Sequence, residues 1–148
     1  GGIRLRAWFI LGGGLIGFFG SMVLRSVRKP LDAVVAQAEA LSDRNAIVLD
    51  MRDTNDRVKG TIPGSIGIPY TEVAARLNEL GCQKTGSQWN CAGAKKVFAF
   101  CNGPVCPQSP MAIRAMTRDG FPADKIYYYR GGMLDWDALG LTMVKDEF

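Results

Sequence analysis

Two cysteines stand five positions apart in the segment "AFCNGPVCPQSP", which covers residues 99–110. A cysteine thiolate is a nucleophile and a metal ligand, and two neighbouring thiols can also form a disulfide. Cys101 and Cys106 are therefore a reactive pair, a disulfide, half of a metal site, or small residues in a tight loop. A metal site needs two further ligands of suitable geometry, and the segment does not supply them, so we expect no metal here.

The composition excludes several kinds of chemistry. The 148 residues include no histidine, which rules out a Ser-His-Asp triad, a Cys-His dyad and a His-ligated metal within this chain. Lys and Arg number 18 against 14 Asp and Glu, a net charge of +4 without a dense basic run. We expect no nucleic-acid partner. Four cysteines are too few for a disulfide scaffold.

The elements that must position the two cysteines alternate between strand and helix after Asn45. Such alternation predicts an α/β fold with a central parallel sheet flanked by helices. The expected elements are strands at 46–50, 95–100 and 125–129, helices at 71–80 and 109–120 with Thr71 and Ser109 as N-caps, and a short helix after Arg130. Reactive groups in such folds gather where strands end and helices begin.

Cys101 follows an expected strand directly and precedes an expected helix. A loop curled between a strand end and a helix N-terminus aims backbone N–H groups inward, where the helix dipole reinforces them. A cysteine in that nest has a lowered pKa and is held as thiolate. This argument favours Cys101 as a nucleophile over a buried structural cysteine.

Three ordered motifs resemble the rhodanese domain family over roughly residues 44–144. "VLDMRDTNDRVKGTIPGSIGIP" (48–69) is similar to the N-terminal signature, and "YYYRGGMLDWDALGL" (127–141) to the C-terminal one. The strand, cysteine, loop and helix of 96–119 fall in the active-site position. The matching residues include Asp50, Arg52, Asp56, Gly60, Ile62, Gly64, Ser65, Gly131, Gly132, Trp136 and Gly140.

The resemblance implies a loop cysteine that accepts sulfane sulfur as a persulfide and passes it to a nucleophile, without a cofactor. By position Cys101 is the sulfur carrier, and Cys106 is a second candidate catalytic residue. The residues expected to cradle the persulfide or an oxyanion are Asn102, Gly103, Pro104, Val105, Pro107 and Gln108. The residues expected to be structural are Asp50, Arg52, Gly64, Gly131, Gly132 and Trp136.

The chain departs from the family pattern at three places. Cys106 stands where the family commonly has a basic residue, which argues against thiosulfate:cyanide activity. The segment after Cys101 is about two residues longer, as in related phosphatases, but Pro107 and Gln108 stand where those need an arginine. Phosphatase and arsenate chemistry are therefore not expected. The family's usual "GHI" reads Gly60-Thr61-Ile62, which removes a histidine of structural role.

The remaining cysteine roles stay open. Cys106 attacks a persulfide on Cys101 to leave a disulfide, receives the sulfur itself, or only fills a tight position. Cys82 and Cys91 flank the polar loop "QKTGSQWN". They form a disulfide in an oxidising compartment and are free thiols in a reducing one.

Residues 7–24 carry no charge and span roughly 27 Å as a helix, close to the hydrocarbon thickness of a bilayer. They predict a transmembrane helix between an N-terminal tail (1–6) and a juxtamembrane amphipathic helix (25–43), which is weakly similar to the first helix of a HAMP linker. The rhodanese-like domain follows at 44–148.

We expect a single-pass protein of the inner (cell) membrane. The flanking charges slightly favour a cytoplasmic domain, and the Cys82/Cys91 pair favours the periplasmic alternative. The expected function is a membrane-tethered sulfurtransferase or persulfide carrier. The alternatives are a non-catalytic subunit of a membrane complex and a Cys101/Cys106 thiol–disulfide switch. The expected partners are a small sulfur donor or protein thiol, the lipid bilayer and a larger membrane complex reached through the glycine-rich span.

Overall fold

The structure is a computed structural model that describes residues 39–145. The expected transmembrane helix at 7–24 lies outside the described residues, as does most of the expected helix at 25–43, of which residues 39–42 are helical. Between residues 39 and 145, no helix is both long and apolar enough to cross a membrane.

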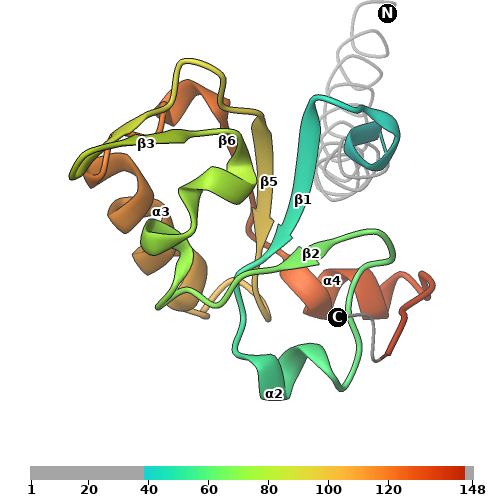
Figure 1. The fold of residues 1–148 in the computed structure, drawn as a ribbon. Helices are drawn as coiled ribbons and strands as arrows, with labels where there is room; N and C mark the ends of the chain where they lie inside the picture. The colour runs from blue at the N-terminus through green and yellow to red at the C-terminus, as the bar shows by residue number, and fades with distance from the viewer. Residues whose placement is uncertain (1–38, 146–148) are drawn as a thin grey trace, which may run out of the picture. The chain divides into compact units, whose positions relative to one another are not determined.

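A four-stranded parallel sheet forms the centre of the fold (Figure 1). Its order is β2-β1-β5-β6, and β1 pairs in parallel with both β2 and β5. This confirms the predicted parallel sheet flanked by helices. The strands are β1 (Ala46–Asp50), β2 (Ile66–Gly67), β5 (Lys96–Phe100) and β6 (Ile126–Tyr129). Strand β2 was not expected, because two residues are too short for a periodic pattern.

Helices cover both faces of the sheet (Figure 1). The helix α3 (Gln108–Arg118) lies on one side, and α4 (Gly132–Ala138) lies on the other. Alternate residues of one strand point to opposite faces, so Leu49 joins the core cluster that α3 supplies with Ala112 and Met116. Phe100, which is fully buried, has its ring 5.9 Å from the guanidinium carbon of Arg52.

The segment 71–80 forms two 3-10 helices instead of the predicted α-helix. They are η1 (Val73–Ala75) and η2 (Leu77–Leu80), and Arg76 between them leaves helical geometry with φ −118° and ψ 27°. Val73, Leu77 and Leu80 are all fully buried in the core. Tertiary packing of these three side chains therefore overrides the local preference for a continuous helix.

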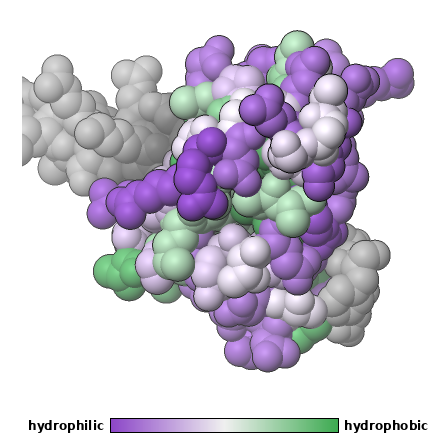
Figure 2. Space-filling model, turned by 60° about the vertical axis from the view of Figure 1, so that its left-hand side comes forward, coloured by the Kyte–Doolittle hydropathy of each residue, from purple (hydrophilic) through white to green (hydrophobic). Residues whose placement is uncertain are grey.

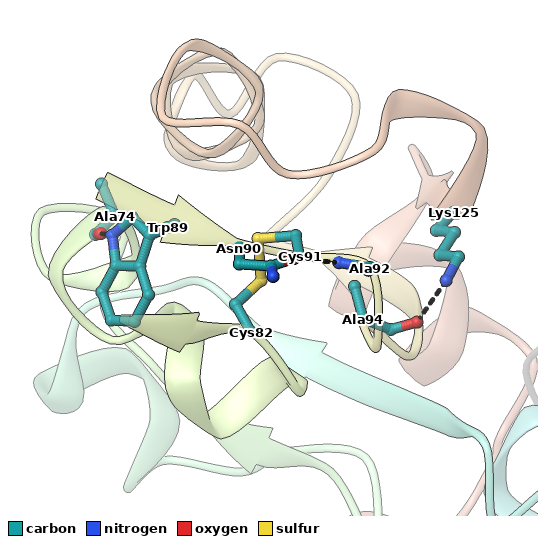
Figure 3. Close-up of a disulfide and its surroundings, with 8 residues drawn as sticks. All are labelled: Ala74, Cys82, Trp89, Asn90, Cys91, Ala92, Ala94 and Lys125. Carbon is teal, nitrogen blue, oxygen red and sulfur yellow. Dashed lines mark hydrogen bonds between the residues drawn. A yellow bond between two sulfur atoms is a disulfide. The ribbon is translucent and has the colours of Figure 1, made fainter. Parts of the chain in front are cut away.

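The expected polar loop between Cys82 and Cys91 is a β-hairpin. Strands β3 (Gln83–Thr85) and β4 (Gln88–Asn90) pair antiparallel, with Gly86 at φ +62° in the turn. Gln83 pairs with Asn90, so the register places the two cysteines opposite each other, with Cα atoms 4.2 Å apart. They form a disulfide that closes the base of the hairpin (Figure 3).

Two short helices complete the fold, and one face of its surface is shown in Figure 2. The helices are α2 (Thr54–Arg57) and η3 (Ala123–Lys125). The face seen in Figure 2 is mainly hydrophilic, with apolar side chains in small areas. The large apolar side chains that are exposed are Leu41, Ile66, Val105, Met111, Tyr127, Leu134, Leu139 and Met143.

Candidate functional site

Cys101 lies directly after β5, at the carboxyl end of the sheet, and is only 1% exposed. The first turn of α4 holds this strand exit. The backbone N–H of Met133 donates to the Cys101 carbonyl (3.0 Å), and that of Leu134 donates to the Asn102 carbonyl (2.9 Å). Gly132 has φ +56°, and a Cβ there would collide with the Cys101 carbonyl oxygen. A glycine is therefore needed for this close approach.

The sulfur of Cys101 faces groups from the loop and from the neighbouring strand. Its Sγ lies 3.6 Å from the carbonyl oxygen of Cys106 and 3.9 Å from that of Gly103. The hydroxyl of Tyr128 is also 3.9 Å away. Tyr128 reaches the site because β6 pairs with β5 in parallel, with Tyr128 beside Ala99. Both strands thus end at the same edge of the sheet.

The pKa of Cys101 is lowered. Burial raises it, but the nearby Cys106 thiol, the backbone N–H and hydroxyl of Ser109 and the backbone of Gly103 favour the thiolate and outweigh burial. Burial and the nearby Cys101 charge raise the pKa of Tyr128 to about 12, so its hydroxyl stays protonated and able to donate. The site therefore favours an ionised sulfur without a cationic side chain among the groups that lower this pKa.

Ser109 has a role different from the predicted N-cap. Helix α3 begins at Gln108 with Pro107 as N-cap, and no side chain caps the helix. The hydroxyl of Ser109 is fully buried and has no hydrogen-bond partner among the described residues. Because a buried unpaired hydroxyl is costly, the Ser109 hydroxyl favours the charged form of the Cys101 sulfur and so lowers the pKa of that thiol.

Cys106 is half-buried, and like the buried Cys101 it is a free cysteine. Its backbone N–H donates to the Gly103 carbonyl (3.1 Å), which curls the loop back. Its thiol donates to Oε1 of Gln108 (3.6 Å), whose Nε2 in turn donates to Asp53 (2.8 Å). Burial and the hydrogen bond to Cys101 raise the pKa of Cys106. The two thiols therefore share one loop but differ in ionisation.

A buried ion-pair network supports the loop from below. The guanidinium of Arg52 binds both carboxylate oxygens of Asp50, at 2.9 and 2.7 Å, and donates to the Gly60 carbonyl. Its remaining nitrogen donates to Oδ1 of Asn102 (3.2 Å). Asn102 donates to Asp56 (2.9 Å), and this hydrogen bond is the main cause of the lowered pKa of Asp56.

The second half of the network is centred on Thr61. Thr61 donates to Oδ2 of Asp50 (2.7 Å), the oxygen that also accepts from Nη2 of Arg52. Arg57 donates to Thr61 and to both the hydroxyl and the carbonyl of Ser65, at 3.1, 3.1 and 2.7 Å. All of these side chains are buried. Gly67 leaves room for Arg57, because a Cβ there would meet its Cδ at 2.6 Å.

A cavity of about 690 Å³ opens beside the loop. Cys106 lines it, whereas Cys101 does not. Val105 (96% exposed), Leu134 and Met111 contribute exposed apolar side chains. None of its lining residues carries a charge; they are Tyr70, Asn102, Gly103, Pro104, Val105, Cys106, Pro107, Gln108, Met111 and Leu134.

The structure brings the predicted loop residues together, whereas the disulfide of Cys82 and Cys91 belongs to the hairpin of β3 and β4. Residues 101–108 form one curled loop, and Asp50 and Arg52 lie beneath it. Gly131 also lies close, since a Cβ on Gly103 would be 3.7 Å from the Gly131 carbonyl oxygen. The structural candidates Gly64 (φ +74°) and Trp136, which donates to the Thr142 carbonyl, lie outside the loop.

Sequence reasoning missed two residues of the sulfur's surroundings, Ser109 and Tyr128. Ser109 was read only as a helix start, although a hydroxyl in the first turn after the loop was a signal for a donor. Tyr128 could be found only from the register of β6 against β5. It is the strand neighbour of Ala99, two residues before Cys101.

Comparison with known proteins supports the family and the fold. The family model of the rhodanese-like domain matches residues 34–139. The HTH-type transcriptional regulator Rv0324 of Mycobacterium tuberculosis is 33% identical over 117 residues, 77% of this chain and 45% of that protein. The putative sulfur carrier protein YrkF of Bacillus subtilis is 32% identical over 95 residues, 64% of this chain and 43% of that protein.

This chain therefore spans less than half the length of these two curated relatives. The crystal structure of the Alr3790 protein from Anabaena sp. has the same fold, with a TM-score of 0.57 at 19% identity. The match covers 78% of this chain and 82% of that one. Because the family model covers most of the sequence and the fold agrees, the chain belongs to the rhodanese-like domain family.

Proposed function

We propose that this chain carries sulfane sulfur as a persulfide on Cys101 and transfers it to a thiol acceptor. The observation that carries the proposal is the position of Cys101 between the end of β5 and the start of α3, where polar groups lower the pKa of its thiol. The N–H and hydroxyl of Ser109 and the backbone of Gly103 all favour its negative charge. The same donors suit the terminal sulfur of a persulfide, which is also an anion.

The proposed reaction moves one sulfane sulfur atom with no net oxidation or reduction. The Cys101 thiolate attacks the sulfane sulfur of a donor, the new S–S bond forms and the donor's bond to that sulfur breaks. An acceptor thiolate then attacks the outer sulfur, and Cys101 leaves as thiolate. A lowered pKa assists both steps, since the sulfur must attack and leave as an anion.

The relative named as a putative sulfur carrier supports this assignment. The loop also disfavours thiosulfate as the donor. Cys106 stands where a basic side chain would meet a dianion, and the adjoining cavity is lined by uncharged residues. A persulfide or polysulfide donor is therefore proposed in place of thiosulfate.

Mass spectrometry after exposure to polysulfide tests the proposal. The wild-type protein is expected to gain the mass of one sulfur atom on a fragment that contains Cys101, and Cys101→Ser is expected to gain none there. The hydroxyl of serine cannot carry sulfane sulfur. Labelling of the wild-type protein that never reaches Cys101 would contradict the proposal.

We also propose that residues 7–24 tether the domain to the inner membrane, on the basis of their length and lack of charge. The Cys82–Cys91 disulfide favours an oxidising compartment, so we place the domain on the periplasmic side. This choice departs from the cytoplasmic preference that the flanking charges gave. Thiol labelling of intact cells, with and without reductant, tests this placement. Cys82 and Cys91 are expected to react with the label only after reduction.

A further inference from the structure

The two free thiols of the loop differ in how accessible they are from the solvent and the cavity. Cys101 is 1% exposed and does not line the cavity, whereas Cys106 is half-buried and forms part of its wall. An acceptor in the cavity therefore meets Cys106 before it meets Cys101. A buried carrier sulfur needs either loop opening or an intermediate group to reach an acceptor of any size.

The geometry makes Cys106 suitable as that group. The Cys101 sulfur lies 3.6 Å from the carbonyl oxygen of Cys106, so the two residues are side by side across the curled loop. The turn from Gly103 to Cys106 is closed by a backbone hydrogen bond of 3.1 Å. Sulfur on Cys101 therefore has a second thiol within the same loop.

The cavity also indicates what kind of acceptor it takes. Its volume of about 690 Å³ lies in the range of small-molecule sites, and its lining residues are uncharged. An anionic acceptor would lose hydration there without gaining a partner, whereas Val105, Met111 and Leu134 offer exposed apolar contact. An uncharged thiol with an apolar body fits this lining.

We propose that Cys106 delivers the sulfane sulfur of Cys101 to an uncharged organic thiol bound in this cavity. The inference rests on the proposed function of Cys101 as the carrier. It assigns Cys106 as a relay residue and names the acceptor by its chemistry.

The relay has two steps that balance in atoms and electrons. Cys106 gives its thiol proton to the outer sulfur of the Cys101 persulfide and attacks that sulfur; the Cys106–sulfur bond forms, and the Cys101–sulfur bond breaks to leave a thiolate. The acceptor thiolate then attacks the same sulfur, and Cys106 leaves and takes up the proton that the acceptor released. Cys101 is suited to leave first, because its surroundings favour the thiolate.

The experiment loads the full chain with polysulfide, removes the excess and adds one of two acceptors. Benzyl mercaptan is uncharged, and 2-mercaptoethanesulfonate is an anion. Intact-mass measurement follows the loss of the bound sulfur with time. In Cys106→Ser, loading of Cys101 is expected to persist, and transfer to benzyl mercaptan is expected to slow by at least about tenfold.

A charge in the cavity wall gives a second test. Leu134→Asp is expected to slow transfer to benzyl mercaptan by at least about tenfold, because the carboxylate disrupts apolar contact. The matched control Leu139→Asp changes an exposed leucine that does not line the cavity, and its rate is expected to stay that of wild type.

The outcomes separate the two proposals. If wild-type Cys101 never takes up sulfur, the proposed function fails and the relay fails with it. If Cys101 loads normally but Cys106→Ser transfers at the wild-type rate, only the relay is overturned. Equal slowing by Leu134→Asp and Leu139→Asp, or faster transfer to the anionic acceptor than to benzyl mercaptan, overturns the assignment of the acceptor.

Discussion

Nη1 of Arg52 lies 3.2 Å from Oδ1 of Asn102, the residue that follows the candidate sulfur carrier. This hydrogen bond joins the buried Asp50–Arg52 ion pair to the loop that surrounds Cys101. Asn102 continues the link by donating to Asp56 (2.9 Å). The start of the loop is therefore held by Arg52 and Asp56, which precede Asn102 in the chain by 50 and 46 residues.

Replacing Asn102 by alanine tests whether this link matters. The change leaves a buried guanidinium N–H and a carboxylate oxygen without partners, so we expect a loss of about 1–2 kcal/mol in the free energy of unfolding. Loading of Cys101 with sulfur is also expected to slow. Urea titration and mass spectrometry measure the two effects. Asn78→Ala, an exposed change with no hydrogen bond from the side chain among those described, is the control and is expected to alter neither.

Asp50 is expected to be the most sensitive position of the network. Asp50→Ala removes the partner of two buried arginines, Arg52 and Arg57, and a lost buried pair costs about 3–5 kcal/mol. Thermal and urea unfolding measure the loss. The exposed pair of Arg118 and Asp119 provides the contrast, since Asp119→Ala is expected to cost under about 1 kcal/mol. Similar losses for the two variants would contradict the role given to the buried network.

Two glycines in left-handed backbone conformations allow the cost of backbone strain to be distinguished from the cost of a steric collision. Gly132 (φ +56°) and Gly140 (φ +67°) each become strained when a Cβ is added, which costs about 1–2 kcal/mol. Only at Gly132 does the new Cβ meet the Cys101 carbonyl; at Gly140 nothing lies within 4 Å. Gly132→Ala is therefore expected to unfold at a clearly lower urea concentration than Gly140→Ala and to lose sulfur loading as well. Equal midpoints would show that the α4 contact does not constrain the strand exit.

The Cys82–Cys91 disulfide is expected to stabilise the fold without taking part in sulfur transfer. It closes a hairpin of ten residues, for which the chain-entropy relation gives about 2–3 kcal/mol. The double variant Cys82→Ala/Cys91→Ala is expected to lose that much in urea unfolding, while polysulfide still loads Cys101. If the double variant is folded in the absence of denaturant but no longer takes up sulfur on Cys101, the hairpin would instead be connected to the site.

Much of the fold followed from the sequence because its signals are local. The strand at 46–50 was predicted with its observed bounds, since a short apolar run ends at a charged residue there. The hairpin was missed because Gln83–Thr85 are exposed and polar and show no apolar face. A turn at Gly86 and a disulfide hold the two strands together instead. The prediction of an α-helix at 71–80 was wrong because packing in the core, rather than the local sequence, decides the geometry of this segment.

The sequence predicted those parts of the candidate site that depend only on position along the chain. Cys101 was found from a strand end and a helix start, which lie within a few residues of each other. Tyr128 and the Arg52–Asn102 bond depend on which strands are neighbours and in what register, which a single sequence does not specify. Ser109 was visible, but the capping rule assigned its hydroxyl to the helix instead of to the sulfur.

The most direct measurement is the pH dependence of Cys101 alkylation by iodoacetamide, resolved from Cys106 by fragment-ion mass spectrometry. Only the thiolate reacts, so the rate rises with pH and levels off above the pKa. The donors around the sulfur lower the pKa of Cys101, and burial raises that of Cys106. We therefore predict a midpoint for Cys101 clearly below that of a free cysteine and below that of Cys106. A Cys101 midpoint at or above the value of free cysteine would contradict the account.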